Sequence, residues 1–155
     1  TTTSNLIWQP VETKDTDIRD LIPQRDPVRM VDRLLRADDD SAEACLTVRT
    51  GNFFLDDDGL LAETGVMEHI AQSASAFAGW RERQKGATSA PLGFIGEVKK
   101  FRCHRRPAVG EELHSVITLL TEFDRILVIA AETRVADEVV AETQMKVALE
   151  AGTNP

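Results

Sequence analysis

Apolar side chains recur at helical spacing in the middle of the chain, and they predict one long helix over Glu63–Gln84. Thr64 is a suitable N-cap for this helix, and Gly86 follows the basic residues that commonly end one. Between Ala71 and Gly79 most side chains are no larger than serine, so other elements can approach the helix from several sides. We therefore expect a curved sheet to wrap around it. The apolar positions are Val66, Ile70, Ala74, Phe77 and Ala78.

Alternation of apolar and polar residues predicts strands on both sides of this helix. A hairpin should precede it, with strands at Met30–Leu35 and Ala42–Arg49, and Asp17–Leu21 should form one short helical turn. Residues 1–16 are polar and should be irregular. Long strands should follow the helix at Leu92–Phe101, Glu112–Phe123, Arg125–Val135 and Val139–Leu149. This order indicates one α+β domain over residues 1–155, in which a curved antiparallel sheet holds a central helix.

Composition narrows the classes of function. The net charge of −8 argues against a nucleic-acid partner, because phosphate binding needs a basic face. No apolar run approaches the roughly 20 residues that a membrane span requires. Cys45 and Cys103 lack metal-ligand spacing and predict buried thiols of a cytoplasmic protein, with no need for a disulfide between them. No nucleotide-binding glycine pattern is present, so we expect neither a cofactor nor a metal.

One short segment is strongly basic within this acidic chain. It is a candidate docking surface for an acidic partner, although a solvated strand edge would carry the same charges. The residues are Lys99, Lys100, Arg102, Arg105 and Arg106.

The chain resembles the (3R)-hydroxyacyl-[acyl carrier protein] dehydratases of fatty acid synthesis. Asp17–Leu35 (DIRDLIPQRDPVRMVDRLL) is similar to the opening of that family, a short helix followed by a His-Arg-x-Pro loop and a Val-Asp-Arg strand. Gly65–Gln72 (GVMEHIAQ) is similar to its central-helix motif, in which a Glu precedes Met-Ala-Gln. The order of elements is that of the hotdog fold. The resemblance therefore implies a hotdog domain that handles acyl thioesters.

The resemblance is incomplete where the family has its catalytic histidine. That histidine lies in a loop just before the helix, and the corresponding stretch here, Gly51–Gly59 (GNFFLDDDG), contains none. Gln24 likewise replaces the His of the earlier loop. Only the carboxylate of the acid–base pair is carried over, at Glu68.

We expect Glu68 to be the catalytic acid–base group, on the first turn of the helix. Gly65 and Val66 should present the positive helix N-terminus to the thioester oxygen. Gln72, one turn further on, should hold the carboxylate in position. Phe54 and Asn52, in the loop before the helix, complete the expected substrate contacts. His69 should point away from Glu68, and a structural role is expected for it.

Three functions remain open on the sequence. The first is a divergent dehydratase in which Glu68 alone moves the proton, in fatty acid or polyene synthesis. The second is a hotdog thioesterase that uses Glu68, and the third is an acyl-binding or partner subunit without turnover. The partner should be an acyl carrier protein or an acyl-CoA thioester. The exposed apolar loop of residues 53–55 and the long strands predict at least a homodimer.

Overall fold

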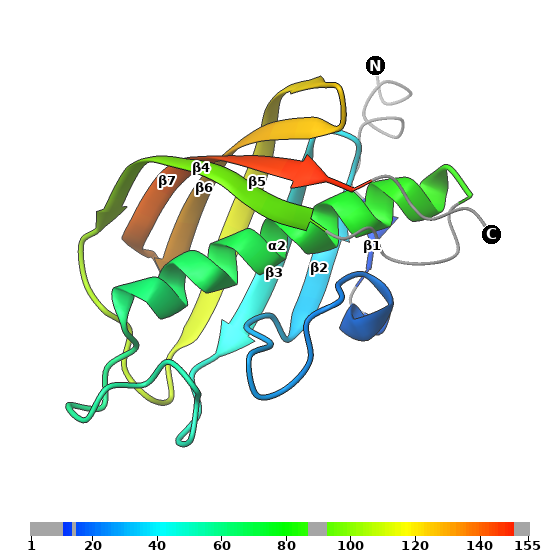
Figure 1. The fold of residues 1–155 in the computed structure, drawn as a ribbon. Helices are drawn as coiled ribbons and strands as arrows, with labels where there is room; N and C mark the ends of the chain where they lie inside the picture. The colour runs from blue at the N-terminus through cyan, green and yellow to red at the C-terminus, as the bar shows by residue number, and fades with distance from the viewer. Residues whose placement is uncertain (1–10, 14, 87–92, 151–155) are drawn as a thin grey trace, which may run out of the picture.

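The computed structural model describes residues 11–13, 15–86 and 93–150. A single long helix, α2 (Glu63–Gln84), lies across one face of an antiparallel sheet (Figure 1). The neighbours in the sheet follow the order β1-β2-β3-β5-β6-β7-β4. A short 3-10 helix, η1 (Ile18–Asp20), precedes β2. The strands are β1 (Val11–Glu12), β2 (Arg33–Ala37), β3 (Ser41–Thr47), β4 (Gly93–Cys103), β5 (Glu112–Phe123), β6 (Ile126–Val135) and β7 (Glu138–Leu149).

The helix α2 is buried on almost every side. From Gly65 to Trp80 every residue is buried except Met67 and Glu68, which are partly exposed. A helix that is covered all round belongs to the core of the domain. The segment around Leu21 packs so closely that a Cβ atom on Gly79 would lie 2.2 Å from the Leu21 carbonyl oxygen. The small residues of the helix therefore allow close contact on several sides, as the sequence predicts.

The strand β4 lies at the edge of the sheet. It pairs with β7, and the register shifts between Lys99 and Arg102. Lys100 has a positive φ of 55°, as found in bulges that twist an edge strand. Three of the basic residues singled out above, Lys99, Lys100 and Arg102, therefore belong to an edge strand.

Most predicted elements are confirmed. The helix has the predicted bounds, and β5 and the later strands agree within one residue at each end. The short turn expected at Asp17–Leu21 is η1, with Asp17 as its N-cap. Val11 and Glu12 pair with Ala37 and Arg36, so the segment expected to be irregular, residues 1–16, contains a short strand. Residues 1–10 lie outside the described part.

Two local predictions are wrong. The N-cap of α2 is Ala62, which makes no side-chain capping bond, and Thr64 lies within the helix. Glu68 therefore belongs to the second turn. The strand expected at Met30–Leu35 begins only at Arg33, because the Met30 N–H and C=O groups bond to side chains of α2 instead of a neighbouring strand.

Candidate functional site

The carboxylate of Glu68 is held by an amide on the next turn of α2. Gln72 Nε2 donates a hydrogen bond to Glu68 Oε1 at 2.8 Å. Glu68 is partly exposed, whereas Gln72 is only 1% exposed. A buried amide with both ends bonded has little freedom to rotate, so it fixes the carboxylate beside it.

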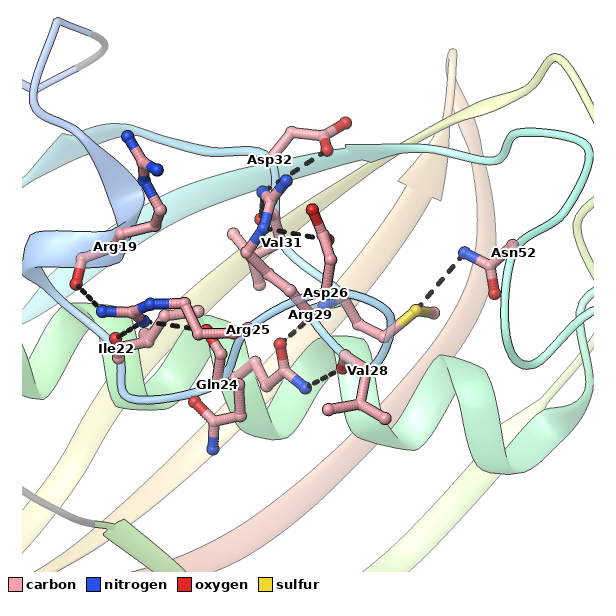
Figure 2. A network of polar contacts seen from close by, with 12 residues as sticks. Arg19, Ile22, Gln24, Arg25, Asp26, Val28, Arg29, Val31, Asp32 and Asn52 are labelled. Atoms are coloured by element: carbon pink, nitrogen blue, oxygen red, sulfur yellow. Dashed lines mark hydrogen bonds and ion pairs between the residues drawn. The ribbon is translucent and has the colours of Figure 1, made fainter.

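Residues 22–31, here called the crossing segment, pass over α2 (Figure 2). Gln72 is itself fixed by this segment. Its Nε2 also donates to Val28 O at 2.8 Å, and its Oε1 accepts from the Met30 N–H at 2.6 Å. The contact predicted between Gln72 and Glu68 is therefore present. The roles of both residues in binding or catalysis remain predictions.

Two arginines shape the crossing segment from within (Figure 2). Arg25 donates to the carbonyl oxygens of Ile22, Gln24 and Arg19. Arg29 donates to Val31 O at 2.7 Å and lies 3.4 Å from an Asp26 carboxylate oxygen. These bonds satisfy backbone groups that no strand pairs, and they fix the loop that carries Val28 and Met30.

His69 is completely buried between α2, the crossing segment and the sheet. Its Nδ1 lies 2.7 Å from Met30 O, and its Nε2 lies 2.9 Å from Ser115 Oγ on β5. Ser115 Oγ in turn lies 2.7 Å from Thr133 Oγ1 on β6. Burial lowers the pKa of His69 from 6.5 to about 4, although the bond to Met30 raises it. The ring is therefore neutral near pH 7 and has a structural role, as expected.

The buried imidazole should make the protein sensitive to mild acid. Unfolded chains protonate this histidine below pH 6.5, whereas the folded state resists protonation down to about pH 4. Stability should therefore fall as the pH drops through this window, by about 2 kcal/mol between pH 7 and pH 5. Asp32 and His114 are the charged groups that act on the ring, in opposite directions.

Urea unfolding of the wild type and of His69→Asn, at pH 7 and at pH 5, measures this effect. The variant cannot titrate at this position, so its stability should lose about 2 kcal/mol less than that of the wild type over the interval. Carboxylates titrate in both proteins and cancel in the comparison. Equal losses would mean that His69 is not the group responsible.

The N-terminus of α2 is closed by the loop before it. The N–H groups of Gly65 and Val66 both donate to Ala62 O, at 2.9 and 3.1 Å. Phe54 packs over Gly65, where an added Cβ would lie 2.6 Å from Phe54 Cβ. These two N–H groups are thus engaged within the turn, and their predicted contact with a thioester oxygen requires this turn to open.

Asn52 is used within the same loop. Its Oδ1 accepts from the Phe54 N–H at 2.8 Å, and its Nδ2 lies 3.4 Å from the sulfur of Met30 (Figure 2). Phe53, next in the chain, is 59% exposed and packs edge-on against Phe54. Asn52 therefore ties the loop to the crossing segment, and substrate contact by Asn52 or Phe54 remains a prediction.

The five basic residues singled out in the sequence, between Lys99 and Arg106, lie in two different environments. Arg105 pairs with Glu111 and Glu138. Arg106 pairs with Asp56 and Asp58 and also donates to the carbonyl oxygens of Leu60 and Leu61. Arg106 therefore holds the loop before α2 in place, whereas Arg105 is engaged by its two glutamates. The other three basic residues, Lys99, Lys100 and Arg102, are exposed, and Lys99 lies 3.7 Å from Glu97.

One signal in the sequence could have indicated the hydrogen-bonded partners of His69. Ser115 and Thr133 occupy inward-facing, fully buried positions of two adjacent strands. A hydroxyl at such a position needs a hydrogen-bond partner. A histidine on the buried helix is a natural candidate.

In the described residues no group of three or more His, Cys, Asp or Glu side chains could hold a metal ion, and no helix is long and apolar enough to cross a membrane.

Comparisons with known proteins identify the family. The family model for ApeP-like proteins, described as ApeP dehydratase, matches residues 16–153. The structure is similar to the dehydratase heterocomplex ApeI:P from Xenorhabdus doucetiae, with a TM-score of 0.80 and 21% identity over 87% of this chain and 91% of that one. No curated protein sequence matches.

Two further solved structures share the architecture at lower identity. The uncharacterised protein PH1136 from Pyrococcus horikoshii has a TM-score of 0.64 and 14% identity, over 93% of this chain and 96% of that one. A hypothetical thioesterase with coenzyme A from Streptococcus pneumoniae TIGR4 has a TM-score of 0.61 and 8% identity, over 79% and 88%. With the family match over most of its length, the chain is a member of the ApeP-like dehydratase family, and it has the hotdog fold.

Proposed function

We propose that this protein is a dehydratase of 3-hydroxyacyl thioesters, carried by an acyl carrier protein or by coenzyme A, in which Glu68 is the acid–base group. The observation that carries the proposal is the Glu68 carboxylate, partly exposed but held by the buried amide of Gln72. Gln72 occupies one carboxylate oxygen and leaves lone pairs for a substrate proton. The dehydratase family supports this chemistry over hydrolysis.

A single carboxylate can complete the elimination. It takes the proton from C2 of the substrate, and the electron pair of that bond forms the C2–C3 double bond as the C3 hydroxyl leaves. The protonated carboxyl then gives its proton to the leaving oxygen, which departs as water, and the carboxylate is restored. The amide of Gln72 stabilises the ionised form at the start and end of this cycle.

A second candidate function is that of one subunit in a mixed dehydratase complex. The relative from Xenorhabdus doucetiae is a heterocomplex, and the loop of residues 51–59 here contains no histidine. The edge strand β4 offers backbone groups to another sheet. In such a complex, the second subunit would supply the other proton-transfer group.

Product analysis with the purified chain separates these functions. The protein is incubated with 3-hydroxyacyl and saturated acyl thioesters of coenzyme A and of an acyl carrier protein, and products are identified by mass spectrometry. A 2-enoyl thioester supports the dehydratase, and a free thiol would establish a thioesterase instead. Binding without product supports the partner subunit. Light scattering on the same sample tests the predicted homodimer, which a monomeric mass at micromolar concentration would contradict.

Carrier docking should depend on the exposed lysines of β4, although Lys99 makes one exposed ion pair with Glu97, and not on Arg105 and Arg106. Reversing Lys99 and Lys100 to glutamate should weaken binding of an acyl carrier protein on the order of tenfold at low salt, because both are exposed. Turnover of a short coenzyme A thioester should be retained. The matched reversal of Arg105 and Arg106 to glutamate should instead lower the free energy of unfolding, because it removes their ion pairs with Glu111 and Asp56. Equal binding by the lysine variant and the wild type would remove β4 as the docking surface.

A further inference from the structure

The peptide groups of Met30 are held at both ends by α2. The Met30 N–H donates to Gln72 Oε1, and the Met30 carbonyl oxygen lies 2.7 Å from His69 Nδ1. His69 and Gln72 are less than one helical turn apart, so the two contacts act on one short stretch of chain. Gln72 also bonds to Glu68, and the place of the carboxylate therefore depends on where Met30 lies.

These contacts define one tautomer of the imidazole. Carbonyl oxygens only accept hydrogen bonds, so the hydrogen between Met30 and His69 must lie on Nδ1. The lowered pKa keeps the ring neutral, which leaves Nε2 as an acceptor. Ser115 must then donate its hydroxyl hydrogen to Nε2, and Thr133 must donate to Ser115. A directional chain of hydrogen bonds thus runs from β6 through β5 to the segment over α2.

We propose that His69 is a positioning residue for Glu68, and that Ser115 and Thr133 set the tautomer through which it acts. By donating to Met30, the ring fixes the peptide on which Gln72 is seated, and Gln72 fixes the carboxylate. The kinetic part of this proposal rests on the proposed function of Glu68, whereas the structural part does not.

Loss of the Ser115 hydroxyl should weaken the arrangement. The Nε2 atom would then have no donor, and only the bond to Met30 would still favour a hydrogen on Nδ1 over one on Nε2. In that tautomer the bare Nδ1 would face the Met30 carbonyl oxygen, and two acceptors repel each other. The crossing segment would loosen, and the amide of Gln72 would no longer be held in one orientation.

The test compares Ser115→Ala with Ser73→Ala. Both serines are fully buried and bonded to His69, but Ser73 donates to the backbone carbonyl and does not touch the ring. The ¹⁵N signals of the imidazole report the tautomer. The exchange rate of the Met30 amide hydrogen reports how often its bond to Gln72 opens, and so how firmly the crossing segment is fixed. The ¹³C signal of the Glu68 side-chain carboxylate reports its environment. All three readouts are independent of turnover.

In Ser115→Ala we expect a mixture of tautomers, faster exchange at Met30 and a shifted Glu68 signal, whereas Ser73→Ala should resemble the wild type. With an active wild type, kcat of Ser115→Ala should fall on the order of tenfold with little change in KM, because a misplaced catalytic group slows the chemical step. His69→Asn keeps a donor near the position of Nδ1 and should retain more activity than His69→Leu. That order of activities would show that the ring positions Glu68 and does not itself transfer the proton.

Unchanged tautomer, Met30 exchange and Glu68 signal in Ser115→Ala would overturn the proposal, whatever the activity. It would also be overturned if Met30 exchange rose while the Glu68 signal and kcat stayed as in the wild type. An inactive wild type would count against the proposed function alone, since the three spectroscopic readouts would still decide whether His69 positions Glu68.

Discussion

Replacing Gly79 by alanine is expected to destabilise the fold by about 3 kcal/mol, since inserting atoms into a packed core commonly costs about 1–3 kcal/mol and here the obstacle is backbone. An ideal Cβ would lie 2.2 Å from the Leu21 carbonyl oxygen and 3.0 Å from its carbonyl carbon. No side-chain rotation relieves this clash, so the segment that carries η1 must move away from α2. The gain of about 1 kcal/mol in helix propensity from glycine to alanine does not offset that movement.

Urea unfolding and thermal melting measure this effect, and the melting temperature should fall by roughly 6–12 °C. Gly96→Ala is the matched control, because its nearest neighbour, Lys146 O, lies at an ordinary 3.7 Å. The control should unfold like the wild type, within about 0.5 kcal/mol. If the two substitutions cost the same, the close approach of Leu21 to α2 does not constrain the fold.

The fold could be predicted from the sequence wherever a long periodic pattern decided it. The spacing of Val66, Ile70 and Phe77 predicts the extent of α2 but not its N-cap, and alternation predicts β5 through β7 within one residue. Such patterns arise from burial of one face or of the whole helix, which acts on each element separately. The family resemblance then placed these elements in the hotdog order, which the sheet topology confirms.

Predictions failed where a distant contact decides local structure. The segment Met30–Leu35 has the alternating pattern of a strand. The peptide groups of Met30 nevertheless bond to His69 and Gln72, which lie 39 and 42 residues further along the chain. Arg106 was grouped with its basic neighbours, yet the aspartates that pair with it lie 50 and 48 residues away. No local pattern reports such partners.

The candidate site could be predicted in part for the same reason. The pair Glu68 and Gln72 is an i, i+4 contact within one helix, so its geometry follows from helical spacing alone. The chain from Thr133 through Ser115 to His69 joins three elements and becomes visible only in the assembled fold. Local spacing therefore predicted the contact between Glu68 and Gln72, whereas the hydrogen bonds that fix Gln72 and His69 required the structure.

Glu68→Gln is expected to lower kcat for 3-hydroxyacyl thioesters by about 10²–10⁴-fold, the range that a general acid–base group contributes. The substitution preserves shape, and the new amide oxygen can still accept from Gln72 Nε2 as Oε1 does. Stability should therefore change by less than about 0.5 kcal/mol, and KM should change little, because only proton transfer is removed. Stopped assays with mass-spectrometric detection of the 2-enoyl product measure the rate, and urea unfolding measures the stability.

Glu63→Gln makes the same chemical change on the same helix, at an exposed position in its first turn, and should keep the wild-type kcat. The comparison separates proton transfer from any general effect of removing negative charge near the helix N-terminus. Equal loss in both variants would indicate an electrostatic effect of charge, and full activity in Glu68→Gln would exclude Glu68 as the acid–base group. A loss confined to Glu68→Gln, in a protein that unfolds like the wild type, leaves proton transfer as the step that the carboxylate performs.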